Sequence, residues 1–85
     1  MMPFHDQILI RMYDHEIIGM RYRSVERISN IINWRELQSQ FRIKKKFQSI
    51  MIKLENAGYV YSHGKSGNVY SLTELGVFYV RGLEN

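Results

Sequence analysis

Cysteine is absent from this chain of 85 residues. Neither a disulfide framework nor a thiolate metal site can therefore form, which excludes a zinc finger. No apolar run approaches the roughly 20 residues that cross a membrane. His5 and Asp6 interrupt the N-terminal apolar stretch, which is not typical of a signal peptide. These absences predict a soluble, intracellular protein.

Groups suited to catalysis are few and scattered. The three histidines, His5, His15 and His63, are far apart in the sequence. Asp14, His15 and Glu16 are consecutive, and neighbouring side chains diverge on a helix, so a solvated helix end fits this run better than a metal site. No glycine-rich phosphate loop or carboxylate pair is present. We therefore expect no enzyme, no metal and no cofactor.

Acidic residues are scarce where the basic residues gather. The formal net charge is +4, but residues 35–65 contain seven bases and two acids, which gives +5 for this segment and −1 for the remainder. A pI of about 9.6 with bases on one segment is typical of a protein that binds a polyanion. The alternative is a plain solvated helix face, because charge runs are common on surfaces.

The chain is long enough for one domain with a small core. Its 45% hydrophobic and 24% charged residues are ordinary for a globular protein. Domains of this size often gain stability from a second chain, so a partner subunit is expected.

Apolar spacing and capping residues predict the elements of the first half. A helix is expected over residues 4–15, with Pro3 suited to its first turn. Residues 16–22 are ambiguous, because Gly19 weakens a helix and the run could instead be a short strand that pairs with the later hairpin. Ser24 is a candidate N-cap for the next helix.

A break in the helical periodicity is expected near Asn33. The apolar residues before and after it would lie on opposite sides of one straight helix. Asn33 followed by Glu36 also has the spacing of a capping box, which predicts that a new helix begins at Trp34.

A basic amphipathic helix is expected from Lys44 to Ala57. At about 100° per residue, its apolar residues fall on one face. These residues are Ile43, Phe47, Ile50, Met51 and Leu54. Gly58 follows directly and can adopt a positive φ, which ends the helix.

Two strands are expected next, within residues 59–72. The loop between them, residues 63–68, contains Lys65 and no acid. Gly64 and Gly67 allow this loop to approach a phosphate backbone closely. A plain solvated hairpin loop is the alternative.

A final helix is expected over residues 74–83. It is apolar nearly all round, and a helix of this kind is seldom exposed to water. Together with residues 4–13 it is the candidate dimer interface. The residues expected there are Ile10, Tyr13, Val77, Phe78 and Val80. The alternative is that both helices wrap the core of one monomer.

Three segments resemble the winged helix-turn-helix transcription regulators of the MarR-like and PadR-like groups. They are residues 37–43 (LQSQFRI), 54–60 (LENAGYV) and 70–76 (YSLTELG). Small winged-helix proteins of archaea and their viruses are similar in size and aromatic content. The chain departs from the pattern in lacking the usual Ser or Thr cap of the recognition helix.

The resemblance implies an α+β, mainly α fold: a winged helix-turn-helix with a two-stranded wing and flanking N- and C-terminal helices. Residues 1–85 would be one domain, with its core at 24–73 and flanking helices at 4–15 and 74–83. The protein would bind double-stranded DNA sequence-specifically and regulate transcription as a dimeric repressor. It would act at the nucleoid in the cytoplasm, or in a host cytoplasm if it is viral.

Helix 44–57 would then lie in the major groove, and the wing, residues 59–72, on the DNA backbone or in the minor groove. The residues expected to read bases are Lys44, Lys45, Gln48 and Ser49. Those expected to contact the backbone are Arg35, Arg42, Lys46, Lys53, His63, Lys65 and Ser66. The alternative is a winged-helix module that binds another protein or RNA and does not read DNA sequence.

Overall fold

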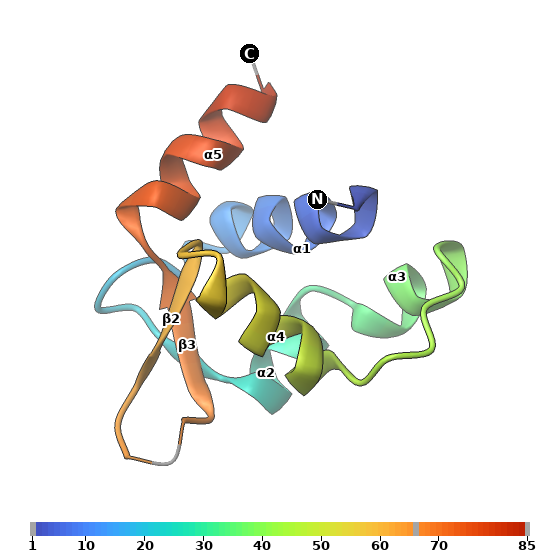
Figure 1. Cartoon of the computed structure of the whole chain (residues 1–85), viewed down its shortest axis with the longest axis horizontal. Helices are drawn as coiled ribbons and strands as arrows, with labels where there is room; N and C mark the ends of the chain where they lie inside the picture. Colours follow the sequence, from blue (N-terminus) through green and yellow to red (C-terminus); the bar gives the residue numbers. More distant parts are fainter. Residues whose placement is uncertain (1, 66, 85) are drawn as a thin grey trace.

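Figure 1 shows the computed structural model, which describes residues 2–65 and 67–84. These residues form an α+β fold, mainly helical, with five helices and a three-stranded antiparallel sheet. The helices are α1 (Pro3–Asp14), α2 (Val25–Ile31), α3 (Trp34–Gln40), α4 (Phe47–Asn56) and α5 (Glu74–Glu84). The strands are β1 (Arg23–Ser24), β2 (Val60–His63) and β3 (Val69–Leu72). The α+β, mainly α class expected from the sequence is confirmed.

The sheet consists of a hairpin and one added strand. β2 and β3 form the hairpin, and β1 pairs with the other edge of β3, which gives the order β1-β3-β2. Segment 16–22, which the sequence left ambiguous, is not a regular strand. Its Ile18 makes a single bridge to Leu72, and the strand that pairs with the hairpin begins just after the segment.

Helices α1, α3 and α4 end in the same kind of turn. After each of them one residue adopts the left-handed backbone conformation: Glu16 (φ 58°), Arg42 (φ 53°) and Gly58 (φ 89°). At the end of α4, Gly58 N–H donates to Glu55 O at 2.9 Å and Tyr59 N–H donates to Leu54 O at 3.1 Å. This pair of hydrogen bonds is a Schellman motif. The prediction that Gly58 ends this helix is confirmed.

Helices α2 and α3 both begin where the sequence predicts, but only α2 has the predicted cap. Ser24 caps α2 as predicted, because its Oγ accepts a hydrogen bond from Arg27 N at 3.1 Å. α3 begins at Trp34 as predicted, but the predicted capping box is wrong. Asn33 has left-handed backbone (φ 57°) and its side chain makes no capping hydrogen bond. Asparagine tolerates this conformation, so here it turns the chain between two helices.

One hydrophobic core lies between the helices and the sheet. α4 packs against α2 and β2, whereas α1 packs against α5 and β3. The fully buried side chains come from every helix and from the hairpin. Among them are Ile8, Leu9, Met12, Ile28, Leu37, Met51, Leu54, Leu72 and Val80.

Thr73 joins the end of α4 to the start of α5. Its hydroxyl donates to Gly58 O at 2.6 Å and accepts from Gly76 N at 3.0 Å, so it caps α5. Gly76 lies so close to the start of the hairpin that an added Cβ would be 2.2 Å from Tyr59 O. The hairpin, the end of α4 and the start of α5 are therefore held together at one point.

Helix α5 packs on α1 within the monomer. The Tyr79 hydroxyl donates to Asp6 Oδ1 at 2.6 Å, and this hydrogen bond, followed by burial, raises the pKa of Tyr79 to about 12. Val80 has no exposed surface and belongs to the core. Of the other residues expected in a dimer interface, Ile10, Tyr13 and Val77 are half-buried against the core, and Phe78 is 68% exposed. The side of α5 that faces solvent is thus the side of Phe78, whereas Val80 lies on the side that is buried in the core.

Candidate nucleic-acid interface

Three consecutive lysines lie in the loop before α4. A helix start at Lys44, expected from the spacing of Ile43 and Phe47, is not observed. Arg42 ends α3 in the left-handed conformation, and Ile43 N–H donates back to Gln38 O at 2.9 Å. Both Ile43 and Phe47 still pack on the core, but Ile43 does so from the turn that follows α3. Lys44, Lys45 and Lys46 are consequently exposed loop residues, and α4 begins only at Phe47.

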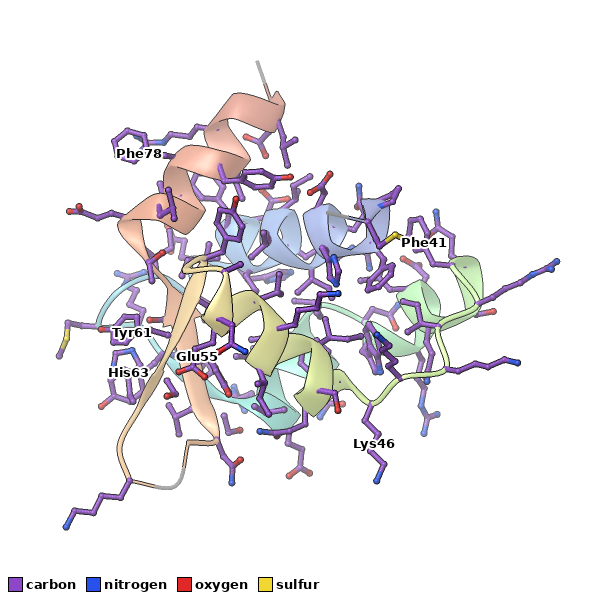
Figure 2. The ribbon with its side chains drawn as sticks, in the orientation of Figure 1. Phe41, Lys46, Glu55, Tyr61, His63 and Phe78 are labelled. Atoms are coloured by element: carbon purple, nitrogen blue, oxygen red, sulfur yellow. The ribbon has the colours of Figure 1, made fainter. Side chains whose placement is uncertain are left out.

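A surface hollow of about 760 Å³ opens between the start of α1, this loop and α4, and we call it the basic hollow. Its described lining contains five basic residues and no acidic residue. The basic residues are Arg42, Lys44, Lys45, Lys46 and Lys53. The remainder are Met2, Phe4, His5, Phe41, Ile43, Ser49 and Ile50. Figure 2 shows Phe41 beside the first turn of α1, and Lys46 reaching into solvent ahead of α4.

The positive charge of the basic hollow is not neutralised within the part of the chain that the structure describes. The two ion pairs among the described residues are Arg11–Glu36 at 2.7 Å and Arg21–Glu16 at 2.8 Å, and neither involves a base of the hollow. Glu36 therefore faces α1, and Glu55, the other acid between residues 35 and 65, accepts hydrogen bonds from Ser62 N and Oγ at 3.3 and 2.7 Å. Both acids of this region are thus held away from its bases.

The residues expected to read bases are divided between two sides of α4. Lys44, Lys45 and Ser49 line the basic hollow. Gln48 is half-buried and lies on another side, in a small depression with Ser24, Val25, Glu26 and Asn68. Adjacent helical residues project about 100° apart, which explains the separation of Gln48 from Ser49. Ile52, 44% exposed, lies between these two sides.

The residues expected to contact a nucleic-acid backbone are more widely spread. Arg42, Lys46 and Lys53 meet in the basic hollow. Arg35 is exposed in the first turn of α3, where it borders a separate depression. Lys65 is exposed in the hairpin loop, and Ser66 lies outside the described residues.

His63 packs against the sheet and is not part of the loop. It is the last residue of β2, and its ring lies 4.2 Å from the Tyr22 ring and 4.1 Å from the Tyr61 ring. Its Nε2 is 2.9 Å from Ser71 Oγ, which in turn donates to Gly19 O at 2.8 Å. These contacts fasten segment 17–22 to the sheet, and Figure 2 shows Tyr61 and His63 on one side of the hairpin with Glu55 on the other.

His5 is a residue of this region that sequence analysis missed. It is only 3% exposed, and it borders the basic hollow. Its Nδ1 accepts a hydrogen bond from Met2 N at 3.2 Å, as a Glu at the third helical position does in a capping box. Burial, and then the charge of Lys53, lower the pKa of His5 below its usual 6.5. The sequence signal that could have indicated this role is a helix start at Pro3, because it places His5 at the third helical position.

Mild acid should destabilise the protein through His5. Because the pKa of His5 is lowered in the folded state, the unfolded chain takes up this proton first as the pH falls. The free energy of unfolding should therefore be constant above pH 6.5 as far as His5 is concerned, and should decline below it until the folded pKa is reached.

Urea denaturation between about pH 8 and pH 5 measures this decline. His5→Gln keeps an acceptor for Met2 N–H but does not titrate, so part of the decline should disappear. His15→Gln, at an exposed histidine, is the matched control and should leave the decline intact. Equal pH dependence in all three proteins would contradict the assignment to His5.

Comparison with known proteins gives no family for this chain. No protein-family model, no curated protein and no solved structure matches it. No described helix is long and apolar enough to cross a membrane. The described residues also contain no group of three or more His, Cys, Asp or Glu side chains that could hold a metal ion.

Proposed function

We propose that this chain is a winged helix-turn-helix protein that binds double-stranded DNA and represses transcription as a homodimer. The order of its elements supports this proposal. A hairpin follows α4 directly, as a wing follows a recognition helix, and β1 pairs with the second strand of that hairpin. α2 packs against both α3 and α4, so it can support α4 as the first helix of the motif supports the second.

The uncompensated charge of the basic hollow is the observation that carries the proposal. Five bases share one surface, and none of them forms a salt bridge to another described residue. Bringing such charges together costs free energy unless an anion binds there. A phosphate backbone neutralises them and releases its own condensed counterions, which is the main source of affinity for duplex DNA.

α4 carries polar side chains that can reach base edges, both beside this hollow and on the neighbouring side of the helix. Gln48 can pair with adenine through two hydrogen bonds, and Ser49 can donate or accept. Ile52, exposed between them, can contact a thymine methyl group. Phosphate contacts from Lys44 to Lys46 would set the position of the helix, and α4 would then supply the sequence preference.

A titration of labelled random-sequence duplex DNA tests the proposal. With about five phosphate contacts, the logarithm of the binding constant should fall with the logarithm of salt concentration at a slope of about −4.5. Affinity should thus drop roughly 10²- to 10³-fold between about 50 and about 200 mM salt. Absence of binding at the lower salt concentration would contradict duplex binding.

Competition with RNA in the same titration distinguishes DNA binding from the alternative of RNA binding. Double-stranded RNA of the same sequence should displace the labelled DNA poorly, because its major groove is too narrow and deep to admit a helix. Equal competition by DNA and RNA would favour a general nucleic-acid binder.

The exposed side of α5 supports the dimer in this proposal. Leu75 and Phe78 are 52% and 68% exposed and border a hollow of about 770 Å³. Glu74 and Arg81 lie seven residues apart on this side, so a second α5 running antiparallel would bring each Glu74 opposite an Arg81 of the other copy. Sedimentation of the free protein measures this association. If the protein is a monomer and still binds duplex DNA, the proposed dimer is wrong but the proposed DNA binding is not affected.

A further inference from the structure

We propose that the basic hollow is a binding site for a nucleoside phosphate, with the base against its aromatic wall and the phosphate between His5, Lys45 and Lys53. The nucleotide can be free or can be an unpaired nucleotide of a strand, since both present the same chemistry. This goes beyond contact with the phosphates of a duplex backbone, which need no apolar wall.

The apolar part of the hollow is formed by α1 and the end of α3. The rings of Phe4 and Phe41 are 6.3 Å apart with their planes tilted by 52°, and both are half-buried. Ile43 and Met2 extend this wall. Aromatic and aliphatic side chains of this kind stack on bases with little sequence preference.

The anion-binding part lies around His5. Its Nδ1 accepts from Met2 N–H, so the hydrogen of the neutral ring is on Nε2, which is a donor. No described residue accepts a hydrogen bond from Nε2. His5 is only 3% exposed, but it belongs to the lining of the basic hollow.

The charges around this donor favour an anion. After burial, the charge of Lys53 on α4 lowers the pKa of His5 most, whereas Asp6 on α1 raises it and Lys45 in the loop adds a smaller lowering effect. A phosphate would accept from Nε2–H and neutralise both ammonium groups, so the repulsion that disfavours a proton on His5 would be relieved. Ser49, exposed at the first turn of α4, offers a further hydroxyl donor.

The size of the hollow agrees with a ligand larger than a phosphate ion. Its volume of about 760 Å³ is within the range of small-molecule sites, and inorganic phosphate would leave the wall of Phe4 and Phe41 bare. An apolar molecule would leave five bases unpaired. A nucleoside phosphate satisfies both parts.

Titration of the full chain with adenosine 5′-diphosphate, inorganic phosphate and adenosine tests the site. Adenosine 5′-diphosphate should bind about tenfold more tightly than either of the other two, since only it fills both parts. NMR should show the imidazole signals of His5 shifting on binding, with its pKa rising toward the ordinary value.

Two pairs of variants test whether the nucleotide binds at the basic hollow itself or is attracted only by the positive charge of the protein. Lys53→Gln should weaken binding of adenosine 5′-diphosphate about fivefold or more, whereas Lys65→Gln, the same charge change in the hairpin loop, should not. His5→Leu removes the donor, and His5→Gln retains an N–H donor and should restore binding. Should His5→Leu not fold, the lysine pair decides alone, because both lysines are exposed.

Three results would overturn the inference: no saturable binding at millimolar concentration, equal affinity for inorganic phosphate, or equal weakening by Lys53→Gln and Lys65→Gln. A duplex with a single-stranded overhang that displaces adenosine 5′-diphosphate would identify a nucleotide of a strand as the ligand. Nucleotide binding that the overhang does not affect would identify a free nucleotide. Duplex binding without nucleotide binding would overturn this inference and leave the proposed function in place. Nucleotide binding without duplex binding would support this inference and overturn the proposed function.

Discussion

Replacing Gly76 by alanine should lower the free energy of unfolding by about 3 kcal/mol, a large part of the stability of a domain this small. The added Cβ would lie 2.2 Å from Tyr59 O and 3.1 Å from Tyr59 C. Both are backbone atoms, so no side chain can rotate away. α5 would have to move off the start of the hairpin, and the hydrogen bonds of Thr73 to Gly58 and Gly76 would weaken with it.

Thermal unfolding followed by circular dichroism measures this loss, which should lower the Tm by roughly 15 °C. Gly82→Ala is the matched control in the same helix, because an added Cβ there meets nothing within 4 Å. That control should be neutral or stabilise by up to about 1 kcal/mol, since alanine favours a helix more than glycine does. If Gly76→Ala unfolds at the same temperature as the parent, the close packing of α5 on the hairpin is wrong.

Replacing Lys44, Lys45 and Lys46 together by glutamine should weaken duplex DNA binding on the order of 10²-fold at low salt. Each lost phosphate contact removes about 0.9 from the salt slope, so the slope should become shallower by about 2.7. All three side chains are exposed, and Lys46 at the N-cap makes no side-chain capping bond. The positive end of the α4 dipole also disfavours cations there, so the variant should be at least as stable as the parent.

Fluorescence polarisation at several salt concentrations measures both the affinity and the slope. The control replaces Arg21, Arg23 and Arg27 by glutamine, which removes the same net charge near β1 and α2. If the arginine and lysine variants weaken binding equally, general attraction to positive charge explains the affinity and the loop has no special role. If the lysine variant binds as the parent does, the interface lies elsewhere.

Local features of this protein could be predicted from the sequence with good accuracy. Ser24 caps α2 and Gly58 ends α4 as predicted, and a new helix does begin at Trp34. Each of these depends on residues within one or two turns of each other. The failure at Asn33 has the same local character, because asparagine suits both an N-cap and the left-handed conformation, and spacing alone does not distinguish them.

Features of the candidate site were less predictable. The spacing of Ile43 and Phe47 fits one helical face, yet the chain reaches both positions by way of a turn at Arg42. Non-glycine residues rarely adopt this conformation, so no sequence rule points to Arg42 as the end of a helix. His5 was overlooked for a different reason, namely that the lysines whose charge lowers its pKa, Lys53 and Lys45, lie 48 and 40 residues away in the sequence.

By itself, the sequence determined the class of fold, the positions of most turns and the excess of positive charge between residues 35 and 65, because composition, periodicity and capping act over short distances. Only the tertiary structure decided that Lys44 to Lys46 leave the helix, that Val80 is buried while Phe78 is exposed, and that His5 shares a hollow with Lys53. The physical reason is that burial and electrostatic neighbours depend on which distant segments pack together, and a helical face does not specify its partner.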